Sequence, residues 1–420
     1  SLYTQLKCPI TKERWLPSEI WSQVFGYLSA EDKYSVRASS KYFKKLADHR
    51  SLWKDWSVVL GLRESSYNRG FWASLRRREV ASVVLRGSQA EDWERAAVLL
   101  PSLTTVVVEH SSHASLGSVA QVPNLKRLAF RSSRIYLMPD AAPAARPQQL
   151  TQLSMCDVTF PSAGLDGFIS ALTQFTNLTS LACHHLGILE DTMWMVHSIL
   201  NCLPKLKHLS LAVMQTPRPL QRVTRPNPRP SGGAAVLSSL EIIDCIGDSL
   251  PEDLMRRPST NSHHLKTWLR RLPQLSTLVV AKGPPVKKYV ASIPATVTRL
   301  TLCVTGLSSE DMADVARQVP DLLHLHIDPW PSHLGGRTAE IPRLFPQLKR
   351  LKLRREHVPE RDFLQLHKLQ DLKYLEILDN RPFLSDIADK LRELTRHSLQ
   401  VVTSPRRRDV WLCPCVSQVY

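Results

Sequence analysis

The sequence has no apolar run near the roughly 18 residues that a membrane-spanning helix needs, so no transmembrane segment is expected. Its first residues, SLYTQLK, lack the hydrophobic region of a signal peptide. The eight cysteines are scattered without the spacing of a disulfide framework. These absences predict an intracellular protein, cytoplasmic or nuclear, in which the cysteines within strand-like segments are reduced core thiols: Cys156, Cys183, Cys245 and Cys303.

The sequence also lacks the motifs of an enzyme. There is no Gly-rich phosphate loop after a strand, no zinc-ligand spacing and no Gly-x-Ser-x-Gly. Cys413 and Cys415 are close enough to ligate a metal together, but no second pair of ligands lies nearby. The sequence therefore predicts a protein with no catalytic residues, no metal and no cofactor.

Positive charge is in excess. The 55 Lys and Arg residues against 38 Asp and Glu give a net charge of +17. Such an excess favours acidic partners and makes nucleic acid an alternative. The basic residues are dispersed, however, and no nucleic-acid-binding motif accompanies them, so nucleic-acid binding is the weakest alternative function.

A repeat with the core Pro-x-Leu-x-x-Leu-x-Leu extends over most of the chain. Clear copies start at Pro101, Pro123, Pro204, Pro273, Pro320 and Pro346, and weaker ones at Val80, Leu150, Leu178, Leu240, Val297, Leu372 and Leu399. This motif at a period of 20 to 30 residues, approximately, is typical of leucine-rich repeats. Strand alternation should point Leu128 and Phe130 into the core, with Arg127 and Ala129 facing outward.

Helices are expected before several of these strands, at Asp191–Leu203, Asn261–Leu272 and Ser308–Val319, because each segment ends at the proline of the repeat. Insertions follow other strands. The longest, Gln215–Gly233, has no acidic and few apolar residues, and it predicts a disordered loop. Shorter insertions are expected at Met138–Gln149, Lys282–Lys288 and Asp328–Arg337, along one rim of the repeat array; they could clamp a substrate or be ordinary exposed loops.

The stretch from Leu16 to Trp53 predicts a different unit, made of three short helices. Pro17 suits a first helical turn, and Ile20, Trp21, Val24, Phe25 and Leu28 follow at helical spacing. A unit of this size is too small to bury so many large apolar side chains. The excess predicts a docking face.

The residues of this stretch resemble an F-box: Leu-Pro-x-Glu, then Val-Phe-x-x-Leu, then Asp32, Phe43 in place of a usual Trp, and Leu52-Trp53. Lys33 departs from the pattern, because family members commonly have an apolar residue there, and this should weaken the contribution of the second helix. The resemblance implies binding to the Skp adaptor of cullin–RING ubiquitin ligases. The adaptor-binding residues are predicted to be Leu16, Pro17, Ile20, Val24, Phe25, Leu28, Phe43, Leu52 and Trp53.

The outward strand positions change character along the repeats. They are small or neutral in early and middle copies, for example Thr105, Gln152, Ser180 and Thr277, and basic in late ones. A basic cluster on the concave face suits an acidic or phosphorylated protein segment, although a solvated charged face is an equal alternative. The predicted substrate-binding residues are Arg299, His324, His326, Arg350, Lys352 and Arg354.

The predicted fold is α/β: an N-terminal three-helix F-box followed by a curved leucine-rich-repeat solenoid, with a parallel concave sheet and helices on the convex side. Its parts are an extension (1–15), the F-box (16–56), a connector (57–79), a solenoid of about 13 irregular repeats (80–403) and a tail (404–420). The predicted function is that of a substrate receptor of an SCF-type ligase. A repeat scaffold or inhibitor without ubiquitin transfer is the main alternative.

Overall fold

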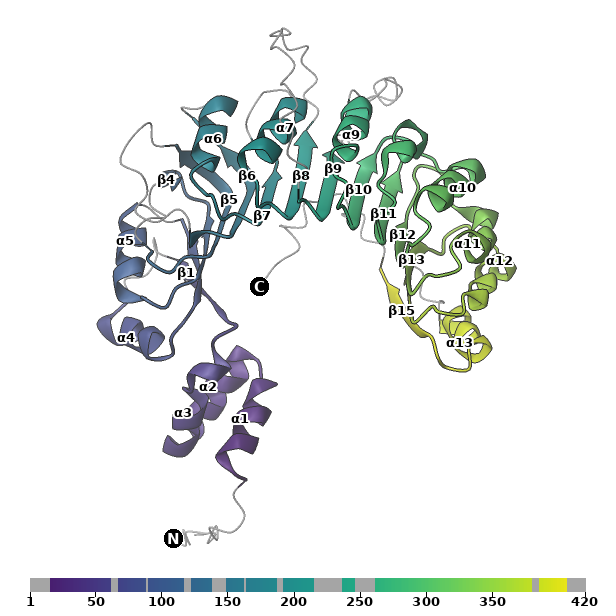
Figure 1. Ribbon diagram of the computed structural model, residues 1–420. Coiled ribbons are helices and arrows are strands. Elements are labelled where there is room, and N and C mark those ends of the chain that lie inside the picture. The colour runs from purple at the N-terminus through teal and green to yellow at the C-terminus, as the bar shows by residue number, and fades with distance from the viewer. Residues whose placement is uncertain are drawn as a thin grey trace, which may run out of the picture.

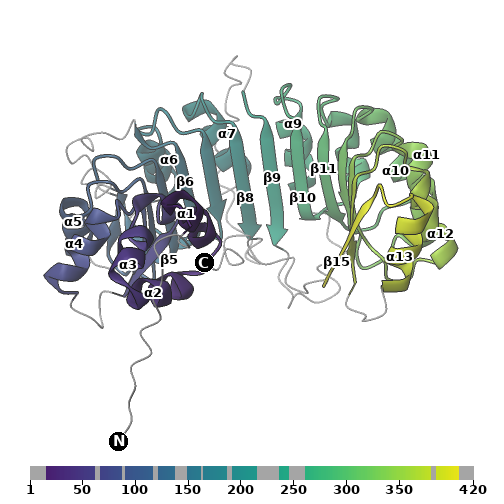
Figure 2. The ribbon, with the colours of Figure 1, turned by 90° about the horizontal axis from the view of Figure 1, so that it is seen from below.

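The protein forms a long arc of parallel strands with helices on its outer side and a small helical unit at its N-terminal end (Figures 1 and 2). The computed structural model describes residues 16–61, 67–87, 90–116, 122–137, 149–161, 164–186, 192–214, 236–245, 261–379 and 385–405. Within these ranges, no helix is both long and apolar enough to cross a membrane. The architecture is the predicted one: N-terminal F-box-like helices followed by a curved solenoid of leucine-rich-repeat type.

The N-terminal unit contains α1 (Ser18–Gly26), α2 (Ala30–Ser39), α3 (Lys41–Ala47) and a 3-10 turn at Arg50–Leu52. Two serines cap its helices: Ser29 Oγ accepts from Asp32 N at 3.1 Å, and Ser40 Oγ accepts from Phe43 N at 3.0 Å. These bonds satisfy backbone donors that the first helical turn leaves free, so the chain can reverse sharply between short helices.

The sheet has fifteen strands in the described residues, and every described pairing is parallel. Except for β4, which pairs only with β5, the strands lie side by side in chain order. Their bounds are β1 Ser57–Gly61, β2 Ser82–Arg86, β3 Thr105–Glu109, β4 Ala114–Ser115, β5 Arg127–Tyr136, β6 Gln152–Thr159, β7 Ser180–His184, β8 His208–Met214, β9 Ser239–Cys245, β10 Thr277–Gly283, β11 Arg299–Val304, β12 His324–Ile327, β13 Arg350–Arg354, β14 Tyr374–Leu378 and β15 Gln400–Ser404.

The outer layer is less regular than the sheet. Its helices are α4 Arg69–Arg77, α5 Ala90–Leu99, α6 Leu165–Leu172, α7 Thr192–Cys202, α9 Asn261–Leu269, α10 Ser309–Gln318, α11 Ile341–Leu344, α12 Glu360–Leu364 and α13 Ser385–Leu394. In the described part of this layer, two 3-10 turns take the place of a helix, at Val286–Lys288 and Val290–Ser292. Two others adjoin helices, Gly335–Glu340 before α11 and Gln365–Lys368 after α12. Helices wider than strands on one side of a parallel sheet force it to curve, so the sheet lies on the concave side of the arc (Figure 1).

The strand alternation predicted from the repeat is confirmed. Leu128 and Phe130 are buried, whereas Arg127 is exposed and Ala129 is half-buried. The buried leucines of successive strands are register partners, and one continuous core extends from Leu60 to Val401. Because each repeat buries its leucines only against its neighbours, the outward positions of the strands are free to vary without loss of the core.

The predicted boundary at residue 80 is wrong. The segment predicted as a connector contains β1 and α4, and β1 pairs with β2 in the same register as the later strands. It is therefore the first unit of the solenoid. The segment SVVLG has one leucine and no preceding proline, so it lacks the motif that identifies later repeats.

The expected helices and loops agree with the structure where it describes them. The three expected helices correspond to α7, α9 and α10. Ser308 is the N-cap of α10 and forms a reciprocal capping box with Asp311. The insertion expected at Lys282–Lys288 starts inside β10 and ends in a 3-10 turn, and the one expected at Asp328–Arg337 follows β12 and also ends in a 3-10 turn. Cys156, Cys183 and Cys303 are buried and form no disulfide within the described residues. The insertion Gln215–Gly233, the tail from 406 with Cys413 and Cys415, residues 138–148 and the side chain of Cys245 lie outside the described residues.

Candidate interaction surfaces

A stripe of exposed apolar side chains follows α1. Leu16, Ile20 and Val24 are 45%, 40% and 41% exposed, and Tyr27 after them is 92% exposed. Spacings of four and three residues place Ile20, Val24 and Tyr27 on one side of the helix, and Leu16 precedes its N-cap. The neighbouring side of α1, which carries Trp21 and Phe25, is also apolar and packs in the core of the helical unit. A helix that is apolar on both sides is normally covered on both sides, so the stripe has the character of an interface.

Three of the predicted adaptor-binding residues do not belong to this surface. Phe25, Leu52 and Trp53 are buried, and with Ala47 they form the core of the helical unit. Trp53 Nε1 donates to Ala47 O at 2.6 Å. These side chains hold α1 against α3 and the 3-10 turn, so their prediction as contact residues is corrected to a structural role.

Leu28 and Phe43 are intermediate cases. Both are half-buried and pack against the same core. The Phe43 ring lies edge-on to the rings of Trp21 and Phe25, with centroids 4.8 Å and 5.6 Å apart. Pro17 is exposed and caps α1. The predicted surface therefore reduces to Leu16, Pro17, Ile20 and Val24, and Tyr27, which the F-box pattern did not include, extends it.

Lys33 is buried rather than solvated. Its Nζ lies 4.7 Å from the centroid of the Trp56 ring and 5.7 Å from that of Trp53, and it donates to Leu52 O at 3.4 Å. Burial lowers the pKa of Lys33. The lysine thus occupies the position of an apolar residue by packing its stem in the core and placing its ammonium over two indole rings.

We expect Lys33→Met to change the free energy of unfolding by less than about 1 kcal/mol. The variant loses the contacts of the ammonium with the indole rings and with Leu52 O, but it no longer has the cost of burying a charge. Lys33→Ala also removes the stem and should cost about 2 kcal/mol more. Urea unfolding of both variants measures the difference. If Met is as damaging as Ala, the charge itself stabilises the unit.

A nearly buried ion pair joins the helical unit to the solenoid. Arg78, which follows α4 and is 3% exposed, donates from Nη2 to Asp48 Oδ1 at 2.8 Å and from Nη1 to Tyr34 Oη at 3.2 Å. Its guanidinium lies 4.4 Å from the centroid of the Trp53 ring, and Arg37 Nε also donates to Asp48 at 2.8 Å. Burial alone would raise the pKa of Asp48, but hydrogen bonds from Arg37 and Arg78 and their charges lower it overall.

The structure does not bring the six predicted substrate-binding residues into one cationic cluster. Arg354 is buried and pairs with Asp328 at 2.9 Å, and Lys352 pairs with Glu376 at 3.2 Å. Burial and the charge of Lys352 lower the pKa of His326 to about 3, so this imidazole is neutral. The carboxylates that neutralise the two cations come from other repeats, and alternation within one strand could not reveal them.

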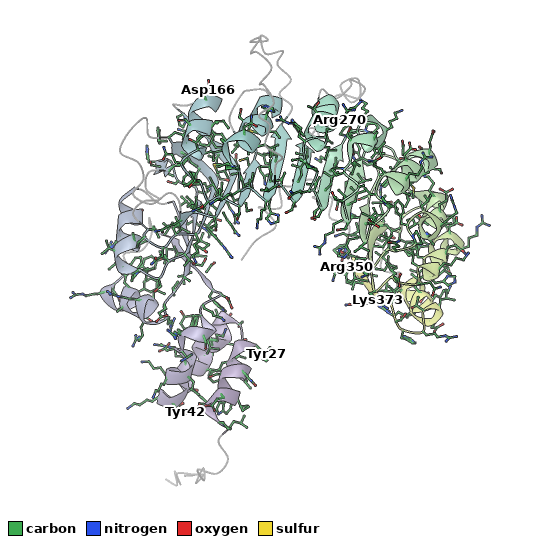
Figure 3. All side chains as sticks on the ribbon, viewed as in Figure 1. Tyr27, Tyr42, Asp166, Arg270, Arg350 and Lys373 are labelled. Atoms are coloured by element: carbon green, nitrogen blue, oxygen red, sulfur yellow. The ribbon has the colours of Figure 1, made fainter. Side chains whose placement is uncertain are left out.

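The other three residues form a row across adjacent strands. Arg299, His324 and Arg350 are register partners on β11, β12 and β13, and Arg350 lies 5.1 Å from the centroid of the Tyr374 ring on β14. Lys349 and Lys373, immediately before β13 and β14, are also exposed. Figure 3 shows Arg350 and Lys373 on the inner side of the arc, whereas Asp166 and Arg270 lie on its outer side. We call these six residues the strand-start patch: Arg299, His324, Lys349, Arg350, Lys373 and Tyr374.

Three polar side chains in the middle of the concave face are of the types found in a catalytic triad: His184, Ser210 and Glu241. Their arrangement differs from that of a triad. Ser210 Oγ lies 2.7 Å from His184 Nε2 and donates to Glu241 Oε2 at 3.1 Å. The carboxylate contacts the serine and not the second nitrogen of the imidazole, so it does not orient His184 as a triad acid would. No group of three His, Cys, Asp or Glu side chains suited to a metal occurs in the described ranges.

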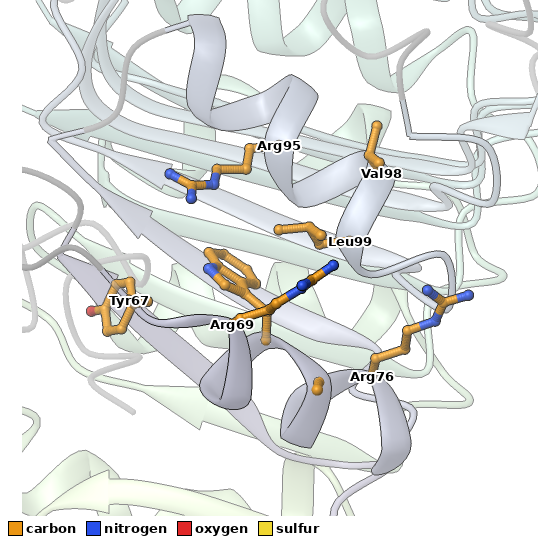
Figure 4. Close-up of a pocket in the computed structure, with 8 residues that line it drawn as sticks. Tyr67, Arg69, Arg76, Arg95, Val98 and Leu99 are labelled. Atoms are coloured by element: carbon orange, nitrogen blue, oxygen red, sulfur yellow. The ribbon is translucent and has the colours of Figure 1, made fainter.

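A groove of about 720 Å³ lies between α4 and α5 on the outer side of the first repeats (Figure 4). Its lining has no carboxylate, imidazole or thiol among the described residues, so it lacks the usual acid–base groups of an active site. Arginines from both helices surround an apolar floor. The lining residues are Tyr67, Arg69, Trp72, Ala73, Arg76, Arg95, Val98 and Leu99.

One family model matches the helical unit at the N-terminal end of the described chain. The F-box-like family matches residues 15–57. Among solved structures, an internalin from Listeria monocytogenes is 14% identical, with 91% of this chain and 92% of that chain covered and a TM-score of 0.29. A search of curated proteins gives no match. F-box domains generally bind adaptors of the Skp type, and the matched residues cover the helical unit.

Proposed function

We propose that this protein is the substrate-recognition subunit of an SCF-type cullin–RING ubiquitin ligase. The exposed stripe of α1 binds the Skp adaptor, and the concave face of the solenoid holds a protein substrate. No catalytic residue is required of this subunit, because holding substrate lysines close to the ubiquitin-loaded enzyme raises their effective concentration.

The observation that carries the proposal is the two-sided apolar character of α1 within a region that matches the F-box-like family. One side supplies the core of the unit, and the other side, Leu16, Ile20, Val24 and Tyr27, remains exposed in the described chain. The Asp48–Arg78 pair supports the proposal further, since a receptor must hold its adaptor and its substrate at a fixed separation.

Affinity capture of the tagged chain from cells with the proteasome blocked tests this function. We expect the Skp adaptor and a cullin in the captured material, together with ubiquitin-modified proteins that disappear when the α1 stripe is altered. A repeat scaffold or inhibitor that acts without ubiquitin transfer would capture its partners equally well with an altered stripe. A nucleic-acid-binding protein would instead show binding that falls steeply with salt and depends on RNA or DNA.

A further inference from the structure

The groove between α4 and α5 has features that the proposed function does not use. It lies on the outer side of the first repeats, whereas the exposed stripe of α1 belongs to the helical unit and the strand-start patch lies on the inner side of the arc (Figures 1 and 3). Its volume of about 720 Å³ is in the range of known ligand-binding clefts. A ligand held in this groove would leave both of the other surfaces free.

One wall of the groove is a row of residues at helical spacing on α4. Arg69, Ala73 and Arg76 are exposed and follow one another at intervals of four and three residues. The small side chain of Ala73 leaves the space between two long guanidinium side chains open. Arg69 is also the first residue of α4, at the positive end of the helix dipole, where a cation is unfavourable. The stability of the helix therefore does not explain an arginine at this position.

The facing wall, on α5, combines an arginine with apolar side chains. Val98 is 76% exposed, more than any other large apolar side chain of the described solenoid, and Leu99 is half-buried. Arg95 precedes them by about one helical turn. Figure 4 shows Arg95 and Arg76 toward opposite ends of the groove, with Leu99 between them. The groove thus has an apolar centre and a cation toward each end.

We infer that this groove binds a short acidic segment of a partner protein, in which a large apolar side chain stands between carboxylates. The apolar side chain contacts Val98 and Leu99, and the carboxylates pair with the guanidiniums of Arg69, Arg76 and Arg95. Guanidinium groups suit this role because their paired N–H donors match the two oxygens of a carboxylate. The inference does not rest on the proposed function, since neither the adaptor surface nor the concave face takes part in it.

The charge and shape of the groove disfavour other occupants. A second copy of the chain carries the same net charge of +17 and would be repelled. Single-stranded nucleic acid needs free aromatic faces for its bases. Trp72 of the lining is buried, however, and the Tyr67 ring stacks on that of Phe71, with centroids 4.4 Å apart. A membrane takes up an apolar face that can enter it, whereas the apolar centre here is recessed between two helices.

The test measures retention of the full chain on three pools of immobilised short peptides. The first pool combines Asp and Glu with Leu and Phe, the second replaces the acids with Asn and Gln, and the third replaces Leu and Phe with Ser and Gly. We expect the first pool to retain the unaltered protein, and the other two to retain it about tenfold more weakly, because each lacks one of the two kinds of contact.

Two matched variants locate the binding site. R69Q/R76Q should bind the first pool about tenfold or more weakly, because two charge-assisted pairs are lost. R77Q/R343Q is the control. It removes two exposed arginines from outer helices, one of them adjacent to Arg76, and neither lines the groove. This control should be retained like the unaltered protein.

The apolar centre is tested in the same assay. Val98→Asp should weaken retention by the first pool about tenfold, whereas Leu394→Asp, which alters an exposed apolar residue on α13, should not. R299Q/R350Q, from the strand-start patch, should also be retained like the unaltered protein. Circular dichroism checks that each variant folds.

Equal losses for R69Q/R76Q and R77Q/R343Q would overturn the inference, since general attraction to a basic protein would then explain binding. A loss confined to R299Q/R350Q would place the binding on the concave face and overturn it as well. Equal retention by the acidic pool without apolar residues, or displacement of the peptides by vesicles of anionic phospholipid, would also contradict it. The adaptor takes no part in this assay, so a failure of the proposed function does not alter its result.

Discussion

Ile20→Asp with Val24→Asp should weaken adaptor binding by about 100-fold or more. Burial of each large apolar side chain contributes about 1.5–3 kcal/mol, and 1.4 kcal/mol corresponds to about a tenfold change in affinity. The variant also places two carboxylates in an apolar contact. Ile20 and Val24 are 40% and 41% exposed, so the substitutions leave the core of Phe25 and Trp53 in place.

The control is Val98→Asp with Leu394→Asp, two apolar side chains that are 76% and 50% exposed on helices of the solenoid. Titration of the purified adaptor into each protein measures the affinities, and circular dichroism checks that each variant folds. Retained affinity in the α1 variant, or an equal loss in the control, would show that the exposed stripe is not the adaptor surface.

Asp48→Ala should lower the free energy of unfolding of the helical unit by about 3–5 kcal/mol, because it leaves the buried guanidinium of Arg78 without its carboxylate. Arg50→Ala is the matched control. It breaks the pair between Arg50 and Glu79, which joins the same two units but is more than half exposed on both sides, and should cost less than about 1 kcal/mol. Urea unfolding followed by tryptophan fluorescence measures both variants.

The same pair predicts a dependence on pH. Because the pKa of Asp48 is lower in the folded protein than its ordinary value of 3.8, its contribution to stability is fully present above that value. The contribution is lost as pH falls through the lowered pKa. The difference in stability between the unaltered protein and Asp48→Asn should therefore shrink in acid. A difference that stays constant down to the acid limit would contradict the role of the ion pair.

Local patterns in the sequence predicted most of the fold. The period of two within each Leu-x-Leu segment identified the buried positions, since a strand must turn alternate side chains to the core. Failures occurred where the deciding contact is distant in sequence. Lys33 was predicted to weaken the contribution of the second helix, and its packing against Trp53 and Trp56 was not predicted. Arg354 alternates with the concave residues, but Asp328 of the preceding strand end neutralises it.

The candidate surfaces were predicted in part for the same reason. The F-box pattern identifies residues by their order, and it does not separate the exposed Ile20 from the buried Phe25, which lie on opposite sides of one helix. Lys349 and Lys373 were omitted because alternation was counted only inside the strand. Basic residues at the same place in two consecutive repeats were the signal for them.

We propose that adaptor and substrate bind to separate surfaces of a rigidly joined chain. Hydrogen–deuterium exchange of the full chain, alone and with purified adaptor, tests this claim most directly. The account predicts slower exchange along α1 and the turn that follows it, with the strands that carry Arg299, His324 and Arg350 unchanged. Protection of those strands by the adaptor, or no protection of α1, would contradict it.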